Sequence, residues 1–214
     1  MTNSAGTRVP LPTPLTDTRV VAIIRRLPAS QSLDRIALLA ECGIGVIEVT
    51  IDSPGWTDVI VGASAAYPGV AFGAGTVRTR DDLSRAADAG AGFALSPHCD
   101  PRLVTAAAAL RLAYLPGAAT PTEAVTAWAH GASAVKLFPA EPSGPALLSA
   151  IRQPLPDIPF VPTGGITPDN ATAYFAAGAA AVAVGGALTA LAPQEMTAAA
   201  HRLLPLAREA APWK

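Results

Sequence analysis

Eight short apolar runs recur along the chain about every 22 residues, the length of one strand and one crossover helix. The runs are VVAIIR (20–25), GVIEVT (45–50), VAFGAGT (70–76), FALSP (93–97), LAYLPG (112–117), AVKLFP (134–139), PFVPTGG (159–165) and AVAVGG (181–186). Their nearly continuous apolar character is typical of parallel strands covered on both faces. Eight such units in 214 residues predict an α/β fold, a (β/α)8 TIM barrel. A doubly wound open sheet is the alternative, but it more usually stops at about five or six strands.

The segments between these runs carry residues that favour the starts and ends of helices, so we expect helices there. The segment 30–43 has an early Ser and a closing Gly, 79–91 begins with Thr, 99–110 has an early Asp, and 120–132 has Pro and Glu in its first turn. We expect residues 1–17, rich in Pro and Thr, to form a flexible tail and residues 18–214 to form a single barrel domain. Trp56 and His98 are expected in loops.

Composition excludes several classes of function. A formal net charge of -1 and the absence of a Lys/Arg cluster argue against a nucleic-acid partner. Cys42 and Cys99 have no disulfide or metal-type spacing, which suits a reducing cytoplasm, and the three histidines are too scattered for a metal centre. Residues 176–193 are uncharged over about the length of a membrane span, but their Ala and Gly favour a buried strand followed by a loop.

Polar residues and glycines gather where the predicted strands end. In a barrel the carboxyl ends of the strands form one mouth, where the chemistry takes place. The residues expected there are Glu48, Thr50, Gly75, Thr76, Ser96, Pro97, Pro116, Gly117, Lys136, Thr163, Gly164, Gly165, Gly185 and Gly186.

Lys136 stands in the middle of an apolar run, and the only other lysine is the C-terminal Lys214. It could extend its amine to solvent or form a buried ion pair with Glu48. Alternatively, an apolar pocket would lower its pKa and leave a free amine that condenses with a carbonyl to a Schiff base. Glu48 could then move the protons of that cycle. Both interpretations place Glu48 near Lys136.

The glycine pairs at 164–165 and 185–186 follow the seventh and eighth runs, where barrels commonly bind phosphate. Without a Cβ atom, their backbone N–H groups can approach phosphate oxygens, although tight turns also use such pairs. Thr76 and Thr163 could cap the helices that follow them or bind a substrate carboxylate or hydroxyl.

The sequence resembles the 2-keto-3-deoxy-6-phosphogluconate and 4-hydroxy-2-oxoglutarate aldolases, a group that includes phosphogalactonate aldolases. The resemblance covers roughly residues 18–190. Its motifs are GVIEVTIDSP, GAGTV, SPH, PGAATPTEA, AVKLFPAE and PTGGI, in this order. It implies a metal-free, cofactor-free class I aldolase with a (β/α)8 barrel, typically a cytoplasmic homotrimer, that splits a 2-keto-3-deoxy sugar acid phosphate into pyruvate and an aldehyde.

The resemblance also implies roles for individual residues. Lys136 matches the Schiff-base lysine and Glu48 the general acid/base. Thr76 matches a residue that binds the pyruvyl carboxylate. The remaining matches are Pro97 and Phe138 in the pocket wall, Thr163, Gly164, Gly165, Gly185 and Gly186 in the phosphate-binding loops, and Arg25 as a substrate contact.

Two positions depart from the family pattern. Asp52 stands four residues after Glu48, where phosphogluconate enzymes usually have arginine and the galactonate branch commonly has asparagine. Ala187 stands where a phosphate-binding serine is frequent. Asp52 puts an anion near an anionic substrate, which would weaken its binding. The alternatives that stay open are a sugar-phosphate epimerase or isomerase, a non-catalytic sugar-phosphate sensor, and a metal-dependent aldolase.

Overall fold

The structure is a computed structural model and describes residues 8–211. Its strands are β1 (Val20–Ile24), β2 (Val46–Thr50), β3 (Ala71–Gly75), β4 (Phe93–Leu95), β5 (Ala113–Leu115), β6 (Gly117–Ala118), β7 (Val135–Leu137), β8 (Phe160–Pro162) and β9 (Val182–Val184). Its helices are α1 (Thr13–Thr18), α2 (Ala29–Glu41), α3 (Trp56–Ala66), α4 (Arg80–Asp88), α5 (Pro101–Ala109), α6 (Pro121–Ala129), α7 (Gly144–Arg152), α8 (Ala171–Ala176), α9 (Gly186–Thr189) and α10 (Pro193–Glu209).

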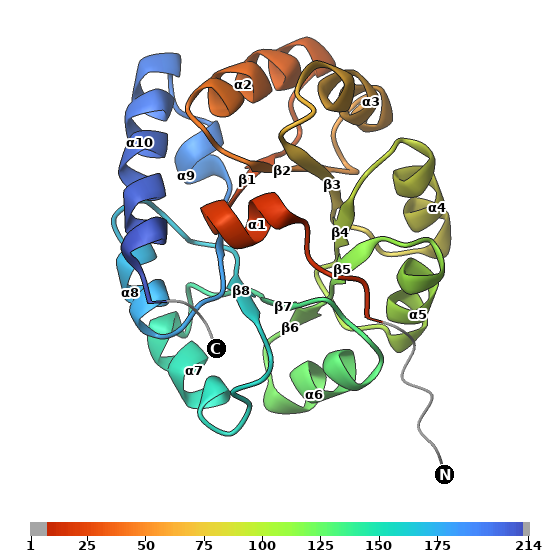
Figure 1. The fold of residues 1–214 in the computed structure, drawn as a ribbon, viewed down its shortest axis with the longest axis vertical. Coiled ribbons are helices and arrows are strands. Elements are labelled where there is room, and N and C mark those ends of the chain that lie inside the picture. Colours follow the sequence, from red (N-terminus) through yellow and green to blue (C-terminus); the bar gives the residue numbers. More distant parts are fainter. Residues whose placement is uncertain (1–7, 212–214) are drawn as a thin grey trace.

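All strand pairs are parallel and fall into two sheets. The larger sheet has the order β5-β4-β3-β2-β1-β9, and the smaller has the order β6-β7-β8. The run 112–117, predicted as one strand, is divided into β5 and β6 at Pro116, which lacks the N–H that a continuous ladder would need. A bridge between Thr163 and Ala183 connects the ends of the two sheets. Figure 1 shows the strands around the centre of the molecule with the longer helices outside them.

The predicted helix starts are partly confirmed. Thr79, Asp100 and Thr120 cap α4, α5 and α6 by accepting hydrogen bonds from backbone N–H groups. The predicted serine cap of the first helix region is wrong, because α2 begins at Ala29 after Pro28 and has no side-chain cap. Trp56, expected in a loop, is instead the buried first residue of α3.

The segment 176–193 contains β9, as expected for a buried strand, but α9 rather than a loop follows it. Within residues 8–211, no helix is both long and apolar enough to cross a membrane.

Helix α1 covers the amino-terminal ends of the strands. Leu15 on this helix is buried with Val21 and Val46 in the cluster between the strands. A Cβ atom at Gly45, at the start of β2, would lie 3.1 Å from Thr18 and 3.2 Å from Pro14, so glycine allows this close approach. The flexible tail expected over residues 1–17 is therefore wrong for residues 13–17, since the apolar Leu15 anchors them; residues 1–7 lie outside the described residues.

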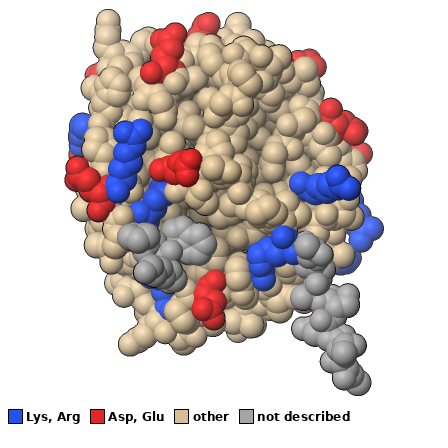
Figure 2. Space-filling model, viewed as in Figure 1, with Lys and Arg blue, Asp and Glu red and all other residues tan. Residues whose placement is uncertain are grey.

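The chain before α1 is also attached to the body of the protein. The guanidinium of Arg8 stacks over Trp128 and donates to the carbonyl of Ala132, and the hydroxyl of Ser133 donates to the carbonyl of Val9 at 2.6 Å. Figure 2 views the face that carries α1 and shows separate charged side chains of both signs on it. The end of the strands that remains open is the opposite, carboxyl end.

Arg19 connects helix α10 to the amino-terminal end of the strands, which α1 covers. Its side chain is buried, and its guanidinium donates to the carbonyls of Ala179, Ala180, Ala207, Ala210 and Ala211 at 2.8–3.2 Å. The ring of Phe175 lies 4.9 Å from the guanidinium carbon. Because the last carbonyls of a helix have no partner within the helix, this one cation stabilises the end of α10.

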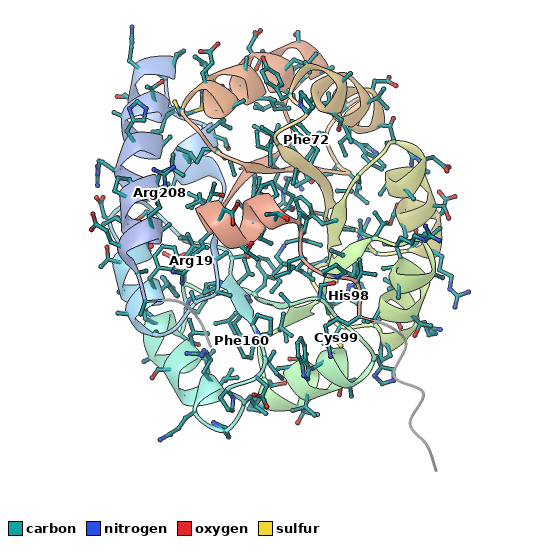
Figure 3. All side chains as sticks on the ribbon, in the orientation of Figure 1. Arg19, Phe72, His98, Cys99, Phe160 and Arg208 are labelled. Atoms are coloured by element: carbon teal, nitrogen blue, oxygen red, sulfur yellow. The ribbon has the colours of Figure 1, made fainter. Side chains whose placement is uncertain are left out.

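Arg19→Met should therefore lower the free energy of unfolding by about 2–4 kcal/mol, since several carbonyls lose a charged donor and three of them are buried. Arg208→Met is the matched control, because Arg208 is exposed in the last turn of the same helix (Figure 3), and it should change stability by less than about 0.5 kcal/mol. Urea unfolding followed by circular dichroism measures both. Equal effects of the two substitutions would contradict the role of Arg19.

Candidate active site

A cavity of about 270 Å³ opens at the carboxyl ends of the strands. Its volume suits a small ligand. It is lined by Ile23, Arg25, Glu48, Thr76, Pro97, Lys136, Phe138, Thr163, Gly164, Gly165, Ile166, Thr167, Gly185, Gly186 and Ala187. The fold thus brings to one cavity every residue to which the family resemblance assigns a role.

Three lining residues were missed by the sequence analysis: Ile23, Ile166 and Thr167. Ile166 and Thr167 directly follow the glycine pair of the loop after β8, so the position of that pair was the signal that could have found them. Ile23 belongs to the inward-facing cluster of β1, which the alternation of side chains along a strand indicates.

Lys136 lies in the middle of β7, in register with Gly117 of β6 and Val161 of β8. Its side chain is only 5% exposed, and its Nζ lies 5.0 Å from the ring centre of Phe138. Among residues 8–211 this Nζ has no hydrogen-bond or ion-pair partner. Burial lowers the pKa of Lys136, and the charge of Arg25 acts in the same direction, although Glu48 opposes them. A share of uncharged amine is therefore available at lower pH than for a free lysine.

Glu48 is buried in β2, with 1% of its surface exposed. Burial raises the pKa of this carboxyl, against the charges of Lys136 and Arg25. Its Oε2 atom is buried without a hydrogen-bond partner in the described chain. No ion pair within 4.0 Å joins it to Lys136, so the structural ion pair considered from the sequence is not formed. An unsatisfied carboxyl oxygen beside a cavity is suited to bind a ligand hydroxyl or a water.

Gly75 makes room for this carboxyl. A Cβ atom at Gly75 would lie 1.7 Å from Oε1 of Glu48 and 2.6 Å from its Cγ. Similarly, a Cβ atom at Gly73 would lie 2.4 Å from the ring of Phe93. From the sequence, Gly75 is expected at the mouth but without this role. The signal was the spacing of two residues between these glycines, which puts both on the same face of β3.

The two glycine pairs differ in whether the backbone and its neighbours would tolerate a side chain there. Gly164 and Gly165 have φ of +90° and +78°, and a Cβ atom at Gly165 would lie 2.2 Å from Glu141, so the backbone itself needs glycine there. Gly185 has φ of -96°, and a Cβ atom added at Gly185 or at Gly186 would have its nearest neighbour 3.9 Å away. A side chain at 185 or 186 would fit the protein but would occupy space at the cavity wall.

The two threonines occupy different backbone environments. Thr76 has φ of +63°, which is uncommon for a residue other than glycine, and α4 is capped by Thr79, so the capping role considered for Thr76 is wrong. Thr163 is buried, and its hydroxyl donates to the carbonyl of Val161 at 3.2 Å. The strained Thr76 backbone at the cavity fits the tendency of such conformations to gather at functional sites.

A carboxylate and two arginines lie at the edge of the cavity. Asp52 Oδ2 is 3.5 Å from Nε of Arg25 and 2.7 Å from Nε of Arg26. Arg25 lines the cavity and Arg26 does not. The side chains of Arg25 and Arg26 are 49% and 73% exposed, whereas that of Asp52 is 27% exposed.

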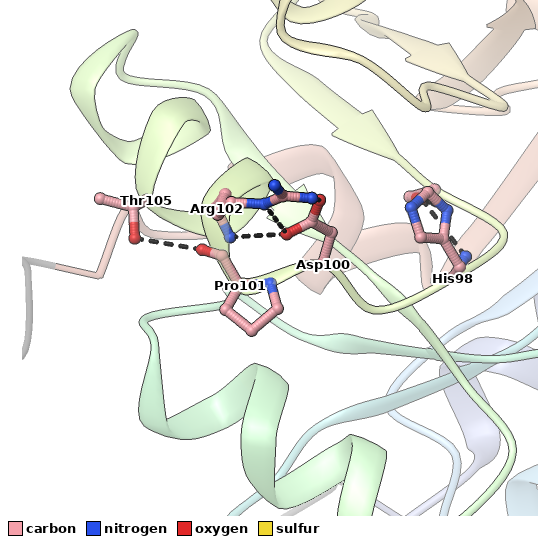
Figure 4. A network of polar contacts seen from close by, with 6 residues as sticks. His98, Asp100, Pro101, Arg102 and Thr105 are labelled. Atoms are coloured by element: carbon pink, nitrogen blue, oxygen red, sulfur yellow. Dashed lines mark hydrogen bonds and ion pairs between the residues drawn. The ribbon is translucent and has the colours of Figure 1, made fainter.

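A polar network fixes the loop that carries Pro97. Figure 4 shows Arg102 in contact with Asp100 through its backbone N–H, at 2.9 Å, and through its guanidinium, at 2.9 and 3.1 Å. His98 Nδ1 lies 2.9 Å from the hydroxyl of Ser96. His98 is in the loop after β4, as expected, and does not line the cavity.

The sequence of the chain is similar to those of known aldolases. The sequence model of the KDPG and KHG aldolase family matches residues 12–199. The chain is 36% identical over 183 residues to a probable 2-dehydro-3-deoxy-6-phosphogalactonate aldolase of Rhizobium meliloti, with 85% of each chain covered. It is 35% identical over 161 residues to a 2-dehydro-3-deoxy-phosphogluconate aldolase of Pseudomonas aeruginosa, covering 75% of this chain and 73% of that one.

Solved structures have the same fold. A structure described as native KDPGal has a TM-score of 0.84 at 29% identity, covering 89% of this chain and 95% of that one. KDPG aldolase from Legionella pneumophila, captured with pyruvate as a covalent carbinolamine intermediate, has a TM-score of 0.77 at 27% identity, covering 92% and 96%. A cage designed by fusing symmetric oligomeric domains also matches, with a TM-score of 0.84 at 29% identity, covering 89% and 72%. The protein has a TIM-barrel-like α/β fold, and the chain belongs to the KDPG and KHG aldolase family.

Proposed function

We propose that the protein is a class I aldolase, a carbon–carbon lyase that cleaves a 2-keto-3-deoxy sugar acid, or 4-hydroxy-2-oxoglutarate, to pyruvate and an aldehyde. The observation that carries this proposal is Lys136, a buried amine that lines a cavity and has no hydrogen-bond or ion-pair partner among the described residues. Aldolases of this family supply the precedent, including the Legionella enzyme with its covalent pyruvate carbinolamine.

The reaction begins when the uncharged Nζ of Lys136 attacks the C2 carbonyl of the substrate. The carbinolamine loses water to become an iminium ion. The C3–C4 bond then breaks, its electron pair moves toward the iminium nitrogen to form an enamine, and the C4 hydroxyl loses its proton as the aldehyde forms. Protonation of the enamine at C3 and addition of water at C2 release pyruvate and restore the amine.

Glu48 is the general acid and base for these proton transfers. Its raised pKa keeps the protonated carboxylic acid available at higher pH than for a free glutamate, so it can donate to the leaving hydroxyl of the carbinolamine. As a carboxylate, it can accept the C4 hydroxyl proton. The gap between Glu48 and Lys136, too wide for an ion pair, leaves space for the reacting carbons or a water.

The other lining residues bind the two ends of the substrate. Thr76 contacts the pyruvyl carboxylate, and Pro97 and Phe138 form the pocket wall. The backbones of Thr163, Gly164, Gly165, Gly185 and Gly186 hold a distal phosphate, with Arg25 as a further substrate contact. The space left beside Gly185 and Gly186 supports a ligand close to the backbone there.

The proposed enzyme is a single-domain, cytoplasmic homotrimer with a closed (β/α)8 barrel. Two links between the sheets support closure: the Thr163–Ala183 bridge at one edge, and at the other edge the chain itself, which passes from β5 of the larger sheet through Pro116 to β6 of the smaller one. The designed cage, fused from symmetric oligomeric domains, supports an oligomer. The free cysteines Cys42 and Cys99 are compatible with a reducing compartment.

Incubation with pyruvate and cyanoborohydride should attach a stable adduct to Lys136, detected by peptide mass spectrometry. Pyruvate release, followed with a lactate dehydrogenase coupled assay, should be lost in both Lys136→Met and Lys136→Arg. Arginine keeps the positive charge but stays protonated and cannot form the imine. Substantial pyruvate release by Lys136→Arg would contradict the Schiff-base role of Lys136. A wild-type protein that neither forms the adduct nor releases pyruvate would instead support an epimerase or isomerase site in which Lys136 only binds an anion.

The rate at which acetic anhydride acetylates Lys136, followed by peptide mass spectrometry, needs only the free amine; it should rise with pH and reach half its maximum below pH 10.5, the ordinary pKa of lysine, because burial favours the free amine. Glu48→Gln removes a charge that raises the pKa of Lys136, so the midpoint should move to lower pH. Arg25→Gln removes a charge that lowers this pKa, so the midpoint should move to higher pH. A wild-type midpoint at 10.5 would contradict the proposed desolvation.

Gly75→Ala should reduce kcat/KM for pyruvate release by about 100-fold, because the added methyl group displaces the carboxyl of Glu48. Gly62→Ala is the matched control: Gly62 lies in α3 with no atom within 4 Å of a Cβ, so activity should be unchanged. Circular dichroism checks that both variants are folded. A fully active Gly75→Ala protein would show that the position of Glu48 is not critical.

A further inference from the structure

The cavity has two cations, and only one of them is available for the distal end of a substrate. Of the lining residues, Lys136 and Arg25 carry positive charge. The proposed aldol chemistry occupies Lys136 with the C2 carbonyl. Arg25 is therefore the side-chain cation that remains for a distal phosphate or carboxylate.

The position of Arg25 is suited to this task. It directly follows β1, which pairs with β2 on one side and with β9 on the other. Glu48 lies on β2, whereas the Gly185–Gly186 pair follows β9. Arg25 thus stands between the proposed proton-transfer group and the proposed phosphate loops.

Asp52 already contacts this cation. Its carboxylate lies 3.5 Å from Nε of Arg25, so it compensates part of the charge. The two terminal nitrogens of this guanidinium have no hydrogen-bond partner within residues 8–211 and can bind a ligand. The same carboxylate binds Arg26, whose backbone N–H in turn binds the hydroxyl of Ser53 at 2.9 Å. Asp52 is therefore held in place from a second side and does not depend on Arg25 for its position.

We propose that Asp52 is a specificity-determining positioning residue: it holds Arg25 at the cavity edge and partly neutralises it, so that the enzyme accepts 2-oxo acids with or without a distal phosphate. This inference rests on the proposed aldolase function. Helix α9 gives a second reason, since its residue Ala187 lines the cavity and offers no hydroxyl to a phosphate.

The test compares two substrates that differ only in the phosphate, 2-keto-3-deoxy-6-phosphogluconate and 2-keto-3-deoxygluconate, in the coupled pyruvate assay. Asp52→Asn keeps the shape of the side chain and removes its charge. The ratio of kcat/KM for the phosphorylated over the unphosphorylated substrate should rise about two- to fivefold, the size expected for a partly exposed charge pair. The change should appear chiefly in KM for the phosphorylated substrate.

A double-mutant cycle shows whether Asp52 acts through Arg25. Arg25→Gln should lower the ratio, and Asp52→Asn should then have no further effect in the Arg25→Gln background. Arg26→Gln is the matched control, because Arg26 shares the carboxylate but does not line the cavity; it should not raise the ratio. Thermal unfolding checks that each variant is folded.

The outcomes separate this inference from the function on which it rests. If the wild-type protein releases pyruvate from none of these two substrates, their galactonate counterparts and 4-hydroxy-2-oxoglutarate, the aldolase proposal fails. If it releases pyruvate but Asp52→Asn leaves the ratio unchanged, or changes it equally without Arg25, only the role of Asp52 is overturned.

Discussion

The structure depends on burying an amine and a carboxyl in one cavity without letting them form an ion pair. Lys136 and Glu48 are 5% and 1% exposed, and each loses most of its hydration. Burial without pairing costs free energy, which the rest of the fold must offset. It also moves both pKa values toward the uncharged forms, lowering that of Lys136 and raising that of Glu48. These are the protonation states that the first steps of imine formation require.

Contacts at the amino-terminal ends of the strands stabilise the fold, whereas the carboxyl ends form the candidate active site. At the amino-terminal end, Leu15 fills the space between the strands, and Arg19 binds five carbonyls that close the carboxyl-terminal helix onto the body of the protein. At the carboxyl end, glycines replace side chains and leave a cavity. Gly75 is the clearest case, because a single methyl group there would occupy the position of the Glu48 carboxyl.

The sequence predicted which residues meet at one cavity better than it predicted the details of the fold. Strand ends in a parallel α/β protein converge, so periodicity alone placed Lys136, Glu48 and the glycine pairs at one mouth. Local signals could not reveal α1, because the anchoring of Leu15 is a tertiary contact within a Pro/Thr-rich segment. The separation of β5 from β6 occurs at Pro116. This proline can be read from the sequence, but whether it interrupts a strand depends on whether a partner strand needs its missing N–H. The role of Gly75 depends on where a side chain from another strand points.

The effect of Asp52 on substrate binding that the sequence predicts differs from the effect that its contacts in the structure indicate. From the sequence, an anion near an anionic substrate predicts weaker binding. In the structure, Asp52 binds Arg26 more closely than Arg25, so the cluster of two arginines and one aspartate keeps a net positive charge at the cavity edge. The anion therefore need not repel the substrate. It can instead moderate a cation, because partial compensation reduces the advantage of a phosphorylated substrate while the free guanidinium nitrogens still offer hydrogen bonds to a neutral one.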